Sequence, residues 1–433
     1  MTGSPPEQHA SWTDALRNRP FRLFWSGQAV SAVGNQMFPI ALAVLAIQRG
    51  MGASGLGLVL AVQGIALAVG TLLGGSVGDR WRRTGVMIVS DIFRLAGAVA
   101  LAWAGHGMPA GALFAVVFVT GCGEGLFQPA SNAVIPRLVP ERLLLPANSL
   151  NGMSIQTAVL VGPAIAGVLA GATSPAVVLW VDAATFAASF VTLVLIREPA
   201  MEVPEPGQAH AGPGPGAVRR AVGDFAEGIR AVRQRSWIGA VILVTTVVMT
   251  LTTAPAYVLL PIEAHLRLGG PAAYGAASAA VGLGSIVGAL AAAKVRSGRP
   301  GLVALAGLFL LSTSWIALAT LPLAGVIVFW AVGGMGVALF NVLWMTALQR
   351  DVPGYLIGRV LSLDMLGSMA LMPVGFALTG PLTAALGPRT LLIAAGLLVV
   401  VVVPLGLLAP GAAEFATPAR ETAIAPVQDL PSR

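Results

Sequence analysis

Four charged side chains interrupt long apolar stretches in the first half of the chain: Asp91, Arg94, Glu124 and Asp182. If these stretches cross a membrane, an unpaired charge costs at least about 2.5 to 3.5 kcal/mol, so each group needs a partner or water. Arg94 and Glu124 both lie roughly 12 to 14 Å from the same end of their helices at about 1.5 Å per residue, and they can therefore meet. Asp91 lies one helical turn from Arg94 and is an alternative partner. Two hypotheses stay open: a fixed ion pair, or a Glu124 that binds and releases protons.

Polar and aromatic side chains form stripes along other apolar stretches and could line a binding cavity. Gln28 and Asn35 lie with Ser31 at spacing i, i+3, i+7, which puts them on one helix face. The remaining candidates are Gln128, Thr246, Thr250, Tyr257, Trp330, Asn341 and Trp344. Threonine hydrogen bonds to their own helix and ordinary helix packing are the alternatives for any one of them. Together with several methionines, these side chains indicate a roomy pocket for an amphipathic or aromatic ligand.

The composition determines which elements must carry these side chains. Of the 433 residues, 56% are hydrophobic and only 10% are charged, whereas soluble domains are about a quarter charged. The mean hydropathy of +0.83 excludes a water-soluble globular protein. The net charge of +7 comes from basic residues in short segments between apolar stretches, so membrane topology explains it and no nucleic acid partner is expected. Cys122 is the only cysteine, and we expect no disulfide, metal or cofactor.

Twelve apolar runs are each near the roughly 20 residues that cross a hydrocarbon core. They are Phe24–Ile47, Leu56–Val77, Val86–Ala104, Ala110–Ala133, Asn151–Ala172, Ala176–Ile196, Ile238–Leu260, Ala272–Ala293, Leu302–Leu321, Ala324–Ala347, Val360–Leu386 and Leu391–Leu408. The predicted organisation is a tail (1–22), a six-helix half (23–196), a flexible linker rich in proline and glycine (197–235), a second six-helix half (236–409) and a tail (410–433).

The arginines are distributed unevenly between the two sides of these runs. Basic clusters fall before the first run and after the second, fourth, sixth, eighth and tenth, whereas the opposite loops hold only Arg49, Arg267 and Arg389. Because short basic loops stay in the cytoplasm, both termini and the linker are predicted to be cytoplasmic, in a multi-pass protein of the inner (plasma) membrane.

The two halves repeat one another at a fixed offset. Gly121 and Arg137 recur as Gly334 and Arg350, 213 residues later, and further matches keep that register without a gap. Chance similarity between apolar runs would not preserve one register for so long, so the sequence predicts duplicated halves arranged in parallel.

The loop after the second run carries a recognisable pattern. It begins at Gly75 and contains Asp79, Arg80, Arg82 and Arg83. An acid and clustered arginines at a helix end can lock neighbouring helices together, although the loop could also be an ordinary basic loop. With the twelve runs and parallel halves, this loop resembles the signature of the major facilitator superfamily, and the resemblance covers nearly the whole chain. In the second half, Ala292 stands at the position of the acid.

Two further stretches favour one branch of that family. Gly162 and Pro163 in the fifth run resemble the Gly-Pro motif of its drug/proton antiporters, where proline kinks the helix and glycine permits close packing. The stretch from Phe127 to Leu150, with Asp91 and Arg94, is similar to enterobactin exporters and macrolide-efflux proteins. The resemblance implies an all-α membrane protein with two six-helix halves around a central cavity, rocking between inward-open and outward-open states. It also implies that the sixth run, with Asp182, is peripheral.

The sequence lacks residues that a serine hydrolase or an ATP-driven pump would require. Gly74–Gly78 fits a serine-hydrolase pattern but lacks a nearby histidine, and the sole Lys294 follows alanine rather than the glycine of a P-loop. We therefore expect no enzyme but a monomeric transporter that exchanges protons for a small amphipathic compound such as a drug, siderophore or secondary metabolite. Multidrug resistance and siderophore export are the expected roles. Uptake by proton symport, and a non-transporting binding or regulatory protein of the same fold, are the alternatives.

Overall fold

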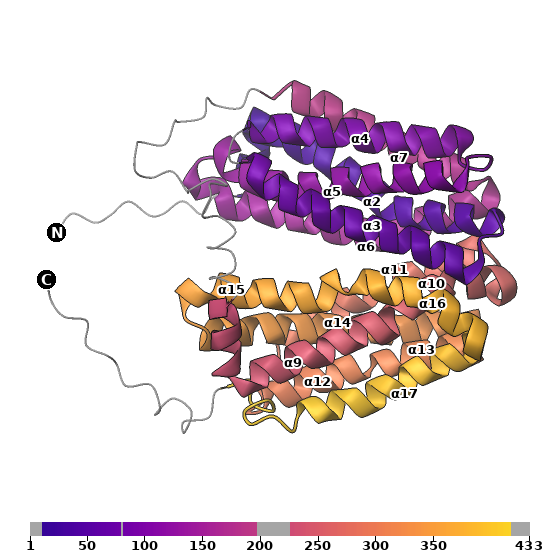
Figure 1. Ribbon diagram of the computed structural model, residues 1–433. Helices are drawn as coiled ribbons and strands as arrows, with labels where there is room; N and C mark the ends of the chain where they lie inside the picture. Colours follow the sequence, from indigo (N-terminus) through magenta and orange to yellow (C-terminus); the bar gives the residue numbers. More distant parts are fainter. Residues whose placement is uncertain (1–10, 79–80, 197–225, 417–433) are drawn as a thin grey trace, which may run out of the picture. The chain divides into compact units, whose positions relative to one another are not determined.

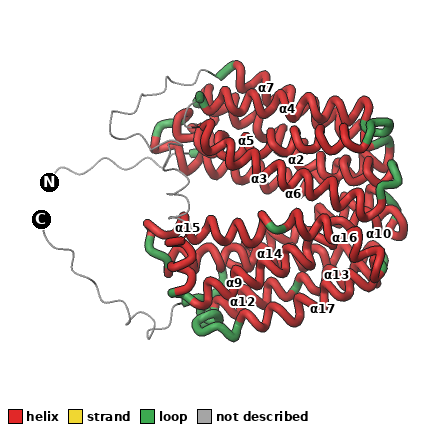
Figure 2. Tube along the Cα trace, viewed as in Figure 1, coloured by secondary structure: helices red, strands yellow, loops and turns green. Residues whose placement is uncertain are grey.

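The computed structural model describes residues 11–78, 81–196 and 226–416, apart from the side chains of residues 75–78. This part of the chain is almost wholly helical and contains no strand (Figure 2). Twelve of its helical segments are long and apolar enough to cross a membrane. Each predicted span falls on one of them, so the prediction of a twelve-span, all-α membrane protein is confirmed.

The first six spans follow a short leading helix, α1 (Trp12–Arg17). They are α2 (Arg19–Gln48), α3 (Gly52–Gly78), α4 (Arg83–Ala104), α5 (Ala110–Leu138), α6 (Leu144–Ala172) and α7 (Pro175–Val194), drawn from indigo to magenta in Figure 1. A 3₁₀ turn, η1 (Glu141–Leu143), precedes α6.

Three of the last six spans are broken into shorter helices. The seventh consists of α9 (Ser236–Val247), η2 (Val248–Thr253), α10 (Ala254–Glu263) and η3 (Ala264–Leu268), the ninth of α12 (Pro300–Phe309) and α13 (Leu311–Thr320), and the eleventh of α15 (Gly354–Met365), η4 (Leu366–Ala370) and α16 (Met372–Leu386). The other three are α11 (Pro271–Ala292), α14 (Leu323–Asp351) and α17 (Pro388–Gly406). The segments η2, η3 and η4 are π-helical, and hydrophobic periodicity at 3.6 residues per turn does not reveal such segments.

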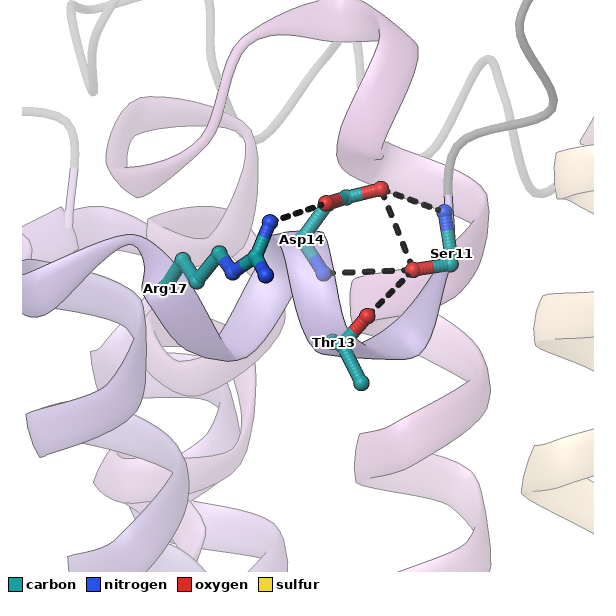
Figure 3. A network of polar contacts seen from close by, with 4 residues as sticks. All are labelled: Ser11, Thr13, Asp14 and Arg17. Carbon is teal, nitrogen blue, oxygen red and sulfur yellow. Dashed lines mark hydrogen bonds and ion pairs between the residues drawn. The ribbon is translucent and has the colours of Figure 1, made fainter.

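Local capping explains where the chain enters its first helices. The Ser11 hydroxyl accepts from the Asp14 backbone N–H, and the Asp14 carboxylate accepts from the Ser11 N–H at 3.0 Å, which forms a capping box (Figure 3). Arg17 pairs with the same carboxylate at 3.5 Å. The Asn18 side chain then accepts from Phe21 N–H and begins α2.

The chain divides by its internal contacts into two compact units. The first comprises Met1–Gly212 with Ala264–Ala279, and the second comprises Pro213–Glu263 with Ala280–Arg433. Within each unit, glycines allow helix backbones to touch. A Cβ on Gly70 of α3 would lie 2.2 Å from the Cys122 carbonyl of α5, and one on Gly284 of α11 would lie 1.8 Å from the Ala331 carbonyl of α14. Only glycine permits such contacts.

Corresponding helices of the two halves preserve the repeat found in the sequence. Helices α5 and α14 both have 29 residues, and each end of α14 lies 213 residues after the same end of α5. The internal repeat is therefore expressed as equivalent elements of the fold.

Two segments predicted to be linker or tail contain folded structure packed on helices of the second unit. Residues 226–233, inside the expected linker, are helical, and Glu227 pairs with Arg359. After α17, the chain packs back so that Phe415 is fully buried and stacks on Trp237 with ring centroids 5.3 Å apart. The Leu302 N–H donates to the Ala413 carbonyl at 3.0 Å. This tail begins with packed structure because its phenylalanine completes an aromatic cluster.

Candidate functional site

The charged side chains of the first unit gather between α4, α5 and α7. Arg94 of α4 is 3% exposed, and its Nη1 lies 3.3 Å from Oδ1 of Asp91, which is fully buried. Both residues are one turn apart on the same helix. Of the two partners that the spacing allowed, the structure therefore pairs Arg94 with Asp91 at ion-pair distance.

Aromatic rings hold the Arg94 guanidinium in place. Its central carbon lies 4.0 Å from the centroid of the Phe186 ring of α7 and 5.1 Å from that of Phe127 of α5. A cation over a ring face is attracted by the ring quadrupole, and the attraction is strongest where water is absent. Three helices thus fix the position of one buried cation.

Glu124 of α5 lies near this cation without contacting it. Glu124, Arg94 and Asn35 line a small cavity of about 20 Å³, room for about one water molecule. The two charges interact electrostatically, but among the described residues Glu124 has no ion pair within 4 Å. Glu124 is therefore partly accessible and is not the fixed partner of Arg94.

Asp182 of α7 is the most isolated acid of the group. It is fully buried, and neither carboxylate oxygen has a hydrogen-bond partner within the part of the chain that the structure describes. A Cβ on Gly34 of α2 would lie 2.5 Å from Oδ1 of Asp182, so the carboxyl group packs directly against the backbone of this glycine. Asp182 interacts electrostatically with Arg94 and Glu124, so its helix belongs to the charge cluster: Asp91, Arg94, Glu124 and Asp182.

The predicted polar stripe on α2 reaches the same region. Gln28 Nε2 donates to the Ser189 hydroxyl of α7 at 3.1 Å, which ties α2 to α7. Asn35 lines the small cavity beside Glu124. Gln128, one turn after Glu124, is exposed and does not line that cavity.

A second, larger cavity lies inside the second unit. Its volume is about 230 Å³, and its lining includes the predicted Tyr257 and Trp330 and two of the predicted methionines, Met369 and Met372. It also includes Trp315 of α13, which sequence reasoning missed. The Trp315 and Trp330 rings meet edge to face with centroids 5.5 Å apart. Trp315 could have been noticed as the one tryptophan in the ninth run.

The other predicted cavity residues of the second unit lie elsewhere. Thr246 donates to the Ile242 carbonyl of its own helix at 2.6 Å, and Thr250 is buried outside the cavity lining. Asn341 is exposed. Trp344 packs edge to face on Trp237 and donates to Asp364 Oδ2 at 3.2 Å.

Asp364 is an acid within the eleventh span that sequence reasoning overlooked. It lies close to the start of the predicted run Val360–Leu386, where it resembles a residue of the helix end, whereas the observed span begins at Gly354. Its hydrogen bond to Trp344 is the structural signal that it is held inside the unit.

The family model for the Major Facilitator Superfamily matches residues 24–375. The chain belongs to the Major Facilitator Superfamily. It is a multi-pass membrane transporter and not an enzyme. The resemblance noted in the sequence is confirmed.

Two relatives of this chain are named as exporters. Over 393 residues the chain is 24% identical to macrolide efflux protein A of Streptococcus pyogenes, covering 88% of this chain and 93% of that protein. Over 388 residues it is 28% identical to the enterobactin exporter EntS of Shigella boydii, covering 86% and 88%.

Solved structures share the fold at low sequence identity. The nucleoside transporter NupG superposes with a TM-score of 0.70 at 11% identity, covering 90% of this chain and 99% of that one. A POT family transporter in complex with 5-aminolevulinic acid gives 0.68 at 14% identity, covering 91% and 97%.

The superfamily's loop signature lies partly outside the described residues, which do not include Asp79 and Arg80. The backbone of Gly75 is in α3, Arg82 precedes α4 and is exposed, and Arg83 is half-buried.

The Gly-Pro motif of α6 lies at two close contacts. A Cβ on Gly162 would lie 2.6 Å from Cβ of Gln36 on α2. Within the first unit, the Pro163 carbonyl lies against Gly275 of α11, where a Cβ would approach it to 2.4 Å. Glycine at these positions lets the helix backbones pack closely.

Proposed function

We propose that this transporter exports a small amphipathic organic compound in exchange for protons across the inner membrane. The relatives named for macrolide efflux and enterobactin export support the direction and the size of the cargo. Proton exchange is supported by one observation, the buried charge cluster.

The cluster holds three carboxyl groups and one guanidinium. If all were ionised, the cluster would carry a net charge of −2 in a region where Asp91, Arg94 and Asp182 are at most 3% exposed. Buried charge without compensation is strongly unfavourable, so protons must replace the missing cations. The Asp91–Arg94 pair supplies the fixed part of the cluster, and Glu124 and Asp182 supply the groups that hold protons.

Glu124 is the group that exchanges its proton with solvent. It borders a cavity that can hold a water molecule, whereas Asp182 is fully buried. A movement that opens or closes this cavity changes the water available to Glu124 and its exposure to Arg94, and therefore its preference for the proton. Such coupling needs two conformations, which alternating access supplies in transporters of this kind.

The proposal includes the orientation of the spans in the membrane and a gate at their cytoplasmic ends, formed by the loop signature, that locks neighbouring helices together. The ends of the spans that carry Arg82 and Arg137 face the cytoplasm, and Asp79 pairs with cations there to hold one closed state. In a Cys122→Ser background, an impermeant thiol reagent applied to intact cells should label a cysteine at Gly107 and spare one at Gly298. The opposite pattern contradicts the orientation, and normal flux in Asp79→Asn contradicts the gate.

Flux in reconstituted vesicles tests the proposal directly. A macrolide and enterobactin are the first compounds to supply, with and without an imposed pH gradient. Antiport predicts that protons moving down their gradient drive the compound the opposite way, and that Glu124→Gln abolishes this uphill movement. Accumulation in the same direction as the protons would establish symport, and the export proposal would then be wrong.

A further inference from the structure

We infer that the cavity inside the second unit is a binding site for an uncharged, largely apolar compound with a hydrogen-bond acceptor such as a ketone, ester or ether oxygen. The inference deepens the proposed export function, on which it rests only for the role of the bound compound as cargo.

The cavity has the size and chemistry of a ligand subsite. Its 230 Å³ exceed the roughly 150 Å³ of an engineered apolar cavity that binds benzene, so it can accept a two-ring aromatic group. Met249, Met369 and Met372 contribute flexible thioethers to its lining. No charged side chain lines it among the described residues, which disfavours an ionised ligand.

Three side chains of the lining carry polar groups that the protein leaves unused. The indole N–H groups of Trp315 and Trp330 and the hydroxyl of Thr253 are buried and have no hydrogen-bond partner in the described part of the chain. A buried donor without a partner costs roughly 1 to 3 kcal/mol. A ligand oxygen that accepts from one or two of them recovers that cost, and the adjacent methionines can move to fit the ligand against them.

The π-helical segment η2 explains why Thr253 is available. Thr245, Thr246 and Thr252 all donate to the carbonyl four residues earlier, as threonine commonly does inside a helix. Thr253 has no such bond and is the last residue of η2. The opposite π-helical segment, η4, contributes Met369 to the same cavity. π-Helical turns are frequent at functional sites because they redirect side chains.

Photolabelling can test the site without any transport. Benzophenone is an uncharged diaryl ketone that, when illuminated, inserts into nearby C–H bonds and favours methionine. With the purified full-length protein in lipid vesicles and no pH gradient, mass spectrometry should find adducts on Met249, Met369 or Met372. Fluorenone should compete with labelling about 3- to 10-fold better than fluorene, which has the same rings without the oxygen, at equal concentration in the bilayer.

Two variants and a matched control locate the hydrogen bond. Thr253→Val removes a donor with little change of shape, and Trp330→Phe removes a donor together with one ring of the indole. Each should weaken fluorenone competition about 2- to 10-fold. Thr252→Val removes a neighbouring hydroxyl that already has a partner, so it should leave competition unchanged.

Several outcomes would overturn the inference. Adducts confined to other residues, equal competition by fluorene and fluorenone, or an equal effect of Thr252→Val would each do so. Since binding is measured without a gradient, failure of proton coupling in the flux assay leaves this result unaffected.

Discussion

The charge cluster predicts that two conservative substitutions change the free energy of unfolding by very different amounts. Asp91→Asn removes the carboxylate that, among the residues the structure describes, is the one within ion-pair distance of Arg94, a cation that is 3% exposed. Breaking a buried pair typically costs about 3 to 5 kcal/mol. We expect about 3 kcal/mol, at the lower end, because Glu124 or Asp182 can then release its proton and leave a carboxylate that attracts Arg94. Glu124→Gln breaks no ion pair and should change the free energy of unfolding by less than about 1 kcal/mol, in the range of ordinary tolerated substitutions.

Reversible unfolding of the purified protein in mixed micelles, followed by fluorescence, gives these free energies. Flux in vesicles measures whether proton movement is coupled to movement of the compound. The double variant Asp91→Asn with Arg94→Gln should recover much of the lost stability, because neither member of the pair then remains uncompensated. If Glu124→Gln destabilises the protein as much as Asp91→Asn, Glu124 is a structural partner and the assignment of roles within the cluster is refuted.

Three further predictions concern other parts of the chain. The capping hydrogen bonds from Ser11 hold the pKa of the Asp14 carboxyl below its usual range. The cap therefore stabilises α1 above the usual carboxyl pKa and is lost as the pH falls through the lower folded-state pKa. Hydrogen exchange of α1 should show this loss, and Ser11→Ala should reduce its pH dependence. Gly284→Ala should destabilise by about 1 to 3 kcal/mol because its Cβ would overlap a backbone carbonyl of α14, whereas Gly107→Ala, which meets nothing within 4 Å, should be near neutral in the same unfolding assay. Arg49→Met should cost about 1 to 3 kcal/mol, because Arg49 donates to the carbonyls of the turn after α4; an unchanged thermal unfolding temperature would contradict that role.

The apolar runs were sufficient to predict the spans, and residue matches at a fixed offset were sufficient to predict the repeat. Lipid requires about 20 apolar residues whatever the tertiary contacts are, so each predicted run falls on an observed helix. The spacing along the sequence cannot select the partner of Arg94 because it allows both Asp91 and Glu124, and only the packing of α4 against α5 selects one. The family resemblance places the sixth run, with Asp182, at the periphery, and the sequence alone does not show that Asp182 packs against Gly34 of α2.

Only some of the residues that line the cavity of the second unit could be predicted, because the seventh span is not a regular α-helix. The stripe through Thr250 and Tyr257 assumes a regular helix, and the π-helical segment η2 interrupts that register. Trp315 escaped notice because a tryptophan in an apolar run is usually core, and its unused N–H is visible only when its neighbours are known.

Substrate-driven proton movement tests the central claim, proton exchange through the charge cluster, most directly. Vesicles containing the transporter and a trapped pH indicator would receive a gradient of whichever compound it carries, with no initial pH difference. Antiport predicts that the wild-type protein moves protons against the flow of the compound, and that Glu124→Gln moves the compound down its gradient with no pH change. Compound crossing with no pH change in the wild-type protein, or an undiminished pH change in Glu124→Gln, would contradict the account.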